Sequence, residues 1–154
     1  MRSGARIGVD LGDRRIGIAR CDAEGIIAMP VATIDRGRGD IRKVVQIIKE
    51  SDAIEVIVGL PRNMDGSEGE SARKVRYWAG LLSRTLGTLP VRMVDERLST
   101  VQAHRHLHEA GRREKSFRSV VDQQAAVIIL DDALAYERAN GCAPGELVEQ
   151  AMEE

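Results

Sequence analysis

Hydrophobic positions divide the chain into a first part made of short apolar runs and a remainder that mixes unbroken apolar runs with helical periodicity. In the first part, runs rich in β-branched residues and separated by turn-forming residues predict strands at residues 6–10, 16–21 and 26–34. Connections this short join strands that lie side by side. We therefore expect these three strands to form an antiparallel meander.

Strands and helices alternate after this meander. Apolar residues at helical spacing predict a helix at residues 41–50 capped by Asp40, and the apolar run at 54–60 predicts a strand covered on both faces. The same patterns predict a helix, a strand and two further helices at residues 70–86, 91–94, 99–110 and 119–140. Strand–helix–strand units build parallel pairs with right-handed crossovers. The sequence thus predicts an α/β fold, with one mixed five-stranded sheet and helices on both of its faces.

Composition adds a domain division. The 154 residues suffice for one compact domain, which we expect at residues 1–140. Residues 141–154 contain four Glu and no Lys or Arg, and we expect them to form a flexible acidic tail. Residues 1–140 therefore contain 23 basic and 20 acidic residues. Aromatic residues make up only 3% of the chain, which argues against a protein that stacks nucleic-acid bases on aromatic side chains.

Targeting and cysteine signals are weak. The N-terminus has no apolar signal core, and no apolar run approaches the roughly 20 residues that span a bilayer, so we expect a cytoplasmic protein. Cys21 and Cys142 match no metal-ligand spacing, and we expect two free thiols.

Acidic residues end two of the predicted strands. Asp10 follows the first strand, at the rim where α/β folds usually bind ligands, although an aspartate there also commonly caps the following turn. Asp95 and Glu96 follow the fifth strand. Successive side chains of a strand point to opposite faces of the sheet, so only one of these two acids can point to the same site as Asp10. The pattern leaves open which one. Both could instead favour the N-terminus of the next helix.

A third acid lies on a helix. Asp122 shares an apolar stripe with Ala125, Ala126, Ile129 and Ala133, where an unpaired carboxylate is costly. Its alternative role is that of a first-turn acid at a helix N-terminus. Three acids that converge from two strand ends and a helix favour a site for Mg²⁺ or Mn²⁺. Two such ions can activate water and stabilise a leaving oxygen, which is the chemistry of phosphodiester hydrolysis.

Basic residues are concentrated between residues 97 and 118. This segment contains six Arg or Lys and three His against two Glu, and it could hold a polyanion by charge neutralisation. A solvated helix face is the alternative interpretation.

Four segments resemble one known family. They are GVDLGDRRIGIA, VGLPRNMDGSEG, VDERLSTVQA and VVDQQAAVIIL, and in this order they resemble the YqgF family of Holliday-junction-resolvase-like proteins over about residues 6–139. The resemblance implies a ribonuclease H-like fold and a bacterial, cytoplasmic nuclease that processes the end of pre-16S rRNA in ribosome biogenesis. It further implies that Asp10, Glu96 and Asp122 bind the metal, and it favours Glu96 over Asp95.

The matched segments also hold candidate substrate contacts. From their positions we expect contacts to phosphate, water or the backbone from Arg15, Asn63, Arg97 and Thr100, and the basic segment adds Arg112 and Arg113. The expected partner is nucleic acid, bound by a monomer or by a homodimer, because a resolvase that cuts two symmetric strands needs a dimer.

Other functions fit some of these features. One alternative is a resolvase of branched DNA, and another is a non-catalytic nucleic-acid-binding factor in ribosome assembly. A third is an ATP-using domain of the actin and sugar-kinase type, which also begins with a strand, an aspartate and a glycine-rich turn. The chain is short for the two lobes that such proteins use to hold ATP.

Overall fold

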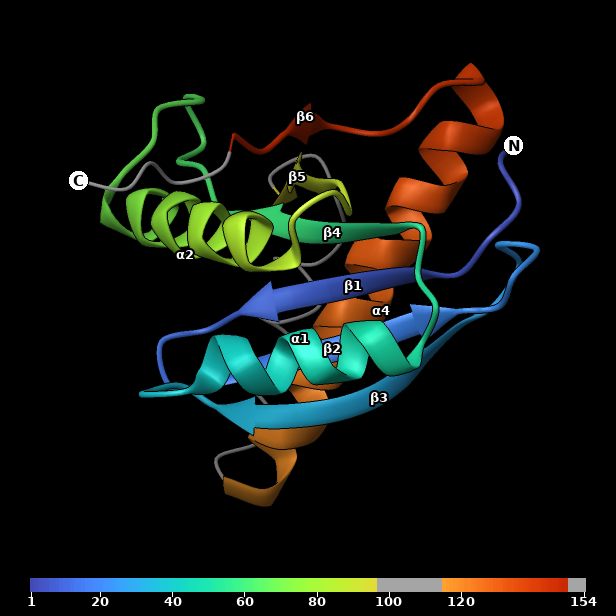
Figure 1. Ribbon diagram of the computed structural model, residues 1–154. Coiled ribbons are helices and arrows are strands. Elements are labelled where there is room, and N and C mark those ends of the chain that lie inside the picture. The colour runs from blue at the N-terminus through green and yellow to red at the C-terminus, as the bar shows by residue number, and fades with distance from the viewer. Residues whose placement is uncertain (97–114, 150–154) are drawn as a thin grey trace.

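The fold is a single mixed sheet between helices, as a computed structural model shows it (Figure 1). The structure describes residues 1–96 and 115–149, with the side chains of 1–96 and 123–149. Nine elements follow one another in this part of the chain: β1 (Arg6–Leu11), β2 (Arg15–Cys21), β3 (Ala28–Asp35), α1 (Asp40–Glu50), β4 (Glu55–Leu60), α2 (Glu70–Leu86), β5 (Val91–Asp95), α4 (Lys115–Asn140) and β6 (Glu146–Leu147). The predicted helix at 99–110 lies outside the described residues.

The sheet has the strand order β3-β2-β1-β4-β5-β6. The first three strands form the expected antiparallel meander, and β1, β4 and β5 are parallel neighbours. The α/β fold class and the arrangement of antiparallel and then parallel strands are confirmed. We call the edge at which β1, β4 and β5 end the carboxyl edge.

The predicted number of five strands is wrong, because β6 adds a sixth. Residues Glu146 and Leu147 pair antiparallel with β5, and the N–H of Val148 donates to the carbonyl of Val91 at 2.8 Å. Val148 is buried in the main core. An exposed strand edge presents backbone N–H and C=O groups without hydrogen-bond partners. This short strand provides such partners at the edge of β5. At least this part of the expected tail is therefore held on the sheet.

Two helix starts also differ from prediction. Gly39, not Asp40, caps α1, and it adopts the left-handed conformation (φ 84°). Asp40 lies inside the first turn, where its carboxylate accepts hydrogen bonds from the N–H of Gly37 (3.0 Å) and from Nε1 of Trp78 (3.3 Å). The last helix begins at Lys115, four residues before the predicted Ser119. None of the helices in the described part of the chain is long and apolar enough to cross a membrane.

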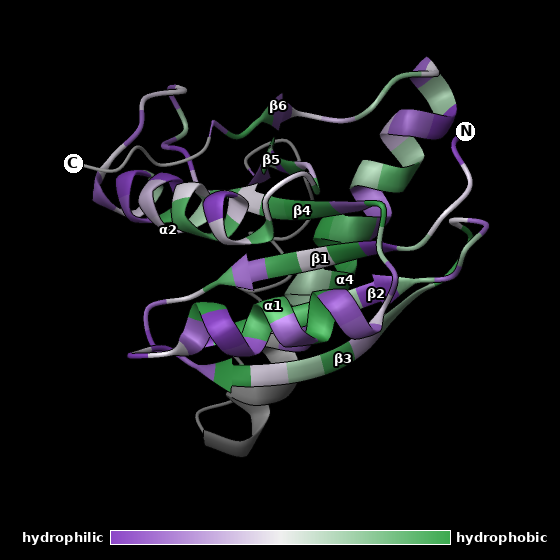
Figure 2. Cartoon of the chain, viewed as in Figure 1, coloured by the Kyte–Doolittle hydropathy of each residue, from purple (hydrophilic) through white to green (hydrophobic). Residues whose placement is uncertain are grey.

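Alternation in the central strands separates two cores. Ile7 and Val9 of β1 face α1 and α2, within the larger cluster of buried residues. Arg6, Gly8 and Asp10 point to the other side, which α4 covers, and we call this side the α4 face. Figure 2 shows β1 as hydrophilic at both ends and hydrophobic between them.

Glycine lets α4 pack directly on β1. A Cβ atom at Gly8 would lie 2.8 Å from both the carbonyl oxygen of Ala126 and the Cβ of Leu130. Any larger residue at position 8 would therefore push the helix away. This close packing fixes where α4 lies along the strand.

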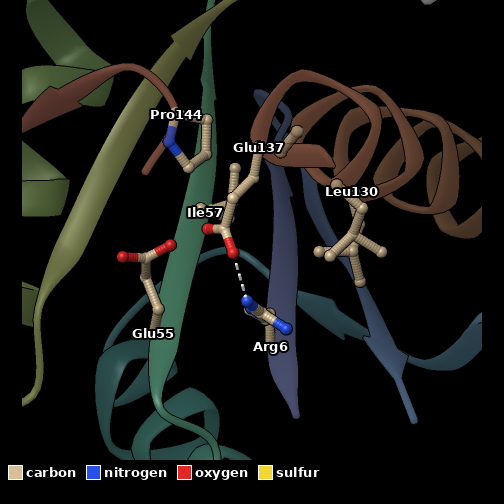
Figure 3. A pocket seen from close by; sticks show the side chains of 8 residues that line it. Arg6, Glu55, Ile57, Leu130, Glu137 and Pro144 are labelled. Atoms are coloured by element: carbon tan, nitrogen blue, oxygen red, sulfur yellow. Dashed lines mark hydrogen bonds and ion pairs between the residues drawn. The ribbon is translucent and has the colours of Figure 1, made fainter. Parts of the chain in front are cut away.

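Buried charges fill the α4 face at the end opposite the carboxyl edge. Arg6, Glu55 and Glu137 are almost completely buried, and we call them, together with the more exposed Arg2 and Arg92, the amino-end cluster. Arg6 Nη2 lies 2.7 Å from a Glu137 carboxylate oxygen, as Figure 3 shows between β1 and α4. Arg92 Nε lies 3.0 Å from Glu55, and Arg2 ion-pairs with both glutamates.

Candidate active site

Asp10 lies at the end of β1 on the α4 face and is 1% exposed. Its neighbours in the adjacent strands are glycines. Gly17 of β2 is its direct cross-strand partner, and the register that pairs Val9 with Val58 places Gly59 of β4 beside it. No side chain of β2 or β4 therefore stands directly next to this carboxylate on the sheet.

Glu96 follows β5 and is also buried, at 3% exposure. Its side chain crosses the end of β4, because a Cβ atom at Gly59 would collide with Glu96 Oε1 and would lie 2.6 Å from Cδ1 of Ile129. Since Gly59 is also the neighbour of Asp10, the structure brings the two acids to the same end of the α4 face. The glycine at position 59 makes this crossing possible.

Asp95 points to the opposite side of the sheet. It shares a face with Met93 of the larger core, and its Oδ2 lies 3.7 Å from Nη1 of Arg62. Arg62 also ion-pairs with Glu68 at 3.5 Å, so Asp95 belongs to a network on the loop after β4. Strand alternation alone did not decide which of Asp95 and Glu96 points to the site. The structure places Glu96 on the side of Asp10 and Asp95 on the opposite side.

Asp122 lies in α4, at a position whose side chain the structure does not describe. The backbone register nevertheless places it along β1. Glu137 contacts Arg6, and Ala126 contacts Gly8, so the helix runs antiparallel to β1 with its first turns towards Asp10.

Gln123 supports this register independently. Its Nε2 donates to Oγ1 of Thr33 at 2.8 Å. Thr33 pairs with Gly17, which in turn pairs with Asp10, so residue 123 lies at the level of Asp10 in the sheet. Sequence reasoning missed this contact.

The candidate substrate contacts are only partly described. Arg15 is half-buried at the start of β2, where it pairs in register with Asp35. Asn63 is exposed in the loop after β4, and its side-chain amide donates to Ser67 Oγ at 2.9 Å. The remaining four candidates lie outside the described residues: Arg97, Thr100, Arg112 and Arg113.

Two features, one in the site and one on the opposite side of the sheet, were not foreseen in the sequence. Gly59 interrupts the apolar run at residues 56–60, and such a glycine often marks a close approach of another group, so the signal was present. The ion pair between Arg62 and Asp95 left no comparable signal, because it depends on how the loop after β4 folds back.

The paired acids fit a hard divalent cation. Burying a carboxylate is costly, and a second carboxylate nearby increases that cost, whereas a bound cation relieves it. Carboxylate oxygens are the ligands that Mg²⁺ and Mn²⁺ prefer. Among the described side chains no group of three or more acids, histidines or cysteines is close enough to hold a metal ion. The described part of the site therefore supplies two candidate ligands, Asp10 and Glu96.

Both cysteines are free thiols, as predicted. Cys21 is buried beside the amino-end cluster, and this burial raises the pKa of its thiol. Cys142 is exposed.

Two relatives of this chain carry the same name. Proteins named "Putative pre-16S rRNA nuclease" from Nocardioides sp. and from Streptomyces avermitilis are each 50% identical to this chain. The first alignment covers 97% of this chain and 99% of its relative, and the second covers 97% of both.

Solved structures share the fold. RuvC of Thermus thermophilus in complex with a Holliday junction substrate has a TM-score of 0.57 at 16% identity, covering 92% of this chain and 99% of that chain. A second structure of Thermus thermophilus RuvC has a TM-score of 0.52 at 14% identity, with 93% and 99% covered. The ribonuclease H-like fold is thereby confirmed.

A family model described as RuvX, Holliday junction resolvase, matches residues 4–136. This match includes β1, β4, β5 and most of α4, the elements that carry the candidate acids. The chain belongs to this family of Holliday-junction-resolvase-like proteins.

Proposed function

We propose that this chain is a metal-dependent nuclease that hydrolyses phosphodiester bonds and acts in the cytoplasm on the end of pre-16S rRNA. One observation carries the proposal: Asp10 and Glu96 are both buried at the carboxyl edge, and Glu96 lies over Gly59, the strand neighbour of Asp10. Membership of a resolvase-like family and relatives named as pre-16S rRNA nucleases support it.

Asp10, Glu96 and Asp122 would hold Mg²⁺ or Mn²⁺, with two ions present once substrate is bound. When bound, such ions supply an activated water at neutral pH and stabilise charge on the leaving oxygen. Asp10 is held rigidly by its place in β1, whereas Glu96 reaches the site through a longer side chain that rests on Gly59 and Ile129. Gly59, the strand neighbour of Asp10, lets the Glu96 side chain lie over it.

Residues around the acids would hold the substrate. Arg15 begins the strand that pairs with β1, and Asn63 lies in the loop that follows β4. We assign phosphate or water contacts to these two and to four residues beyond the described part: Arg97, Thr100, Arg112 and Arg113. Guanidinium groups suit this role because they bind phosphate with paired hydrogen bonds.

The decisive test compares Asp10→Asn with the wild type. Both proteins, purified by the same protocol, are incubated with a pre-16S rRNA fragment and with a four-way DNA junction in the presence of Mg²⁺ or Mn²⁺. We expect cleavage by the wild type and none by the variant, whose circular dichroism should match the wild type. Equal cleavage by both proteins would mean that the acids are not the active site.

Resolution of branched DNA is the second candidate function, favoured by the description of the family model. A resolvase makes two symmetric cuts and therefore needs a dimer, whereas a nuclease that trims an RNA end can act as a monomer. Preference for the junction in the same assay, together with a dimer in sedimentation, would support this candidate. Binding of either substrate without cleavage would instead support an assembly factor.

A further inference from the structure

Exposed arginines lie on two loops and at the start of α1, at the carboxyl edge. Arg14 is in the turn between β1 and β2, Arg38 is in the loop between β3 and α1, and Arg42 is in the first turn of α1. We call these three residues the basic edge. None of them belongs to the candidate contacts assigned above.

The turn between β1 and β2 directly follows the strand of Asp10, and the loop after β3 lies at the same edge two strands away. β3 runs in the same direction as β1, so the two strands end at the same edge of the sheet, as Figure 1 shows beside the start of α1. The turn after β1 closes through a hydrogen bond from the N–H of Gly12 to the carbonyl of Arg15 at 2.9 Å. Arg14 is thus only four residues from Asp10 and lies in a tight turn.

Arg36 joins the two loops. Its backbone N–H donates to the carbonyl of Arg14 at 2.8 Å, and its Nη1 donates to the carbonyl of Gly12 at 2.8 Å. Its Nε also lies 3.4 Å from Oδ2 of Asp40. These contacts hold the loop that carries Arg38 against the turn that carries Arg14, so the basic edge has a defined position.

The guanidinium groups of the basic edge are available. No described residue forms an ion pair with Arg14, Arg38 or Arg42, in contrast to Arg36. Arg38 stands between Gly37 and Gly39, both at positive φ, and a Cβ atom at either glycine would meet nothing within 4 Å. The loop therefore projects into solvent.

Acidic residues offset these charges only partly. Asp13 and Asp35 are exposed on the same loops, and Asp40 is buried against Arg36. Against these three acids stand six basic residues of the two loops and the first turn of α1: Arg14, Arg15, Arg36, Arg38, Arg42 and Lys43. The edge is therefore net positive next to two buried carboxylates, which is suited to a polyanion whose phosphates must approach an acidic site.

We infer that the basic edge binds the phosphate backbone of the nucleic acid on the β3 side of Asp10. The strand would pass from Arg38 over Arg14 to the candidate acids. This inference rests on the proposed function, and it adds a contact surface separate from the segment at residues 97–118. Contacts of this kind fix the position of the substrate without reading its sequence.

Binding is measured in the Asp10→Asn background, so that cleavage does not interfere. Fluorescence anisotropy follows a labelled RNA duplex with a single-stranded 5′ extension, and in a second arm a labelled four-way DNA junction, over a range of salt concentrations. Substitution of Arg14→Ala and Arg38→Ala together should weaken binding about tenfold and lower the slope of log K against log salt by about two units.

The matched control replaces two exposed arginines elsewhere, Arg20→Ala and Arg73→Ala, which change the net charge equally. This control should leave the slope close to its original value, and Arg14→Lys with Arg38→Lys should restore most of it. Equal slopes in the two alanine pairs, or no binding of either probe, would overturn the inference. If Asp10→Asn does not change cleavage while the slopes differ, the binding surface stands and the nuclease proposal fails.

Discussion

Beneath α4 the sheet buries charged side chains at both ends, and the two ends differ in what stands beside each charge. In the amino-end cluster, Arg6 pairs in register with Glu55 and reaches Glu137 across the gap to the helix. At the carboxyl edge, the strand neighbours of Asp10 are Gly17 and Gly59. One end places opposite charges of the same chain beside one another. The other has glycines at the two strand positions next to its acid, and a second acid, Glu96, crosses one of them.

This difference separates stability from function. A buried ion pair is costly to break, because the loss of one partner leaves the other charge buried and unpaired. A glycine beside an acid lets another group approach closely, as the Glu96 side chain does over Gly59. The same helix covers both ends, so the amino-end cluster and the contact at Gly8 set where the first turns of α4 meet the acids.

The largest effect is expected at Glu96. Glu96→Gln should lower the rate of RNA cleavage by more than about 100-fold, since even groups one shell outside a metal cost 10- to 100-fold when lost. Asp95→Asn is the matched control, because Asp95 faces the other side of the sheet and pairs with Arg62. Initial rates at saturating Mg²⁺ measure both. Equal losses in the two variants would contradict the assignment of Glu96.

The next largest effect concerns the amino-end cluster. Glu137→Ala leaves the buried Arg6 without its partner and should lower the free energy of unfolding by roughly 3–5 kcal/mol, as measured by urea denaturation. Glu70→Ala provides the control, since its pair with Lys74 is exposed and contributes only about 0.3–0.5 kcal/mol. Comparable losses in the two variants would show that the buried pair contributes little.

Glycine substitutions test how closely α4 packs on the sheet at Gly8 and at Gly59. Gly59→Ala and Gly8→Ala should each lower the free energy of unfolding by about 1–3 kcal/mol, because a Cβ atom would crowd α4 at either position. Only Gly59→Ala should also displace Glu96 and lower cleavage at a temperature where both variants are folded. Paired unfolding and cleavage measurements check this, and equal activity in both would disprove the role of Gly59.

The smallest effect is a dependence of stability on pH. Burial acts to raise the pKa of Glu137, but hydrogen bonds from Arg2 and the charge of Arg6 outweigh it, and the pKa lies below its ordinary value. The resulting stabilisation is complete above the pKa of an unfolded glutamate, about 4.3, and is lost as the pH falls through the folded value. Urea denaturation across this range should show a smaller acid-induced loss in Glu137→Gln than in the wild type. If the free energy of unfolding fell equally with pH in both proteins, this role of Glu137 would be refuted.

The sequence predicted regular elements well, because their hydrophobic periodicity is local. The helix at Glu70–Leu86 has the predicted bounds, and β1 and β2 each differ from prediction by one residue. The strand β6 was missed because two residues are too few to show a hydrophobic period. They form a strand because they pair with the open edge of β5.

Long-range contacts were harder to foresee. Glu137 follows Leu130 by seven residues on the buried stripe of α4, and Arg6 and Glu55 are charged residues that begin buried strands, so each was a visible exception to the pattern. That they pair with one another depends on the sheet register, which the pattern does not contain. Selection of Glu96 over Asp95 likewise needed the position of Gly59 beneath its side chain.

The short strand β6 has a practical consequence for handling the protein. A chain cut after Asn140 would lose the pairing with β5, and bare strand edges invite association between copies. At the other margin of the sheet, β3 carries Pro30 and an irregular register opposite Ile18 and Ala19, features that discourage such association. Purification tags are therefore better placed beyond the last residue than substituted for the tail, and a shortened chain should precipitate more readily than the full one.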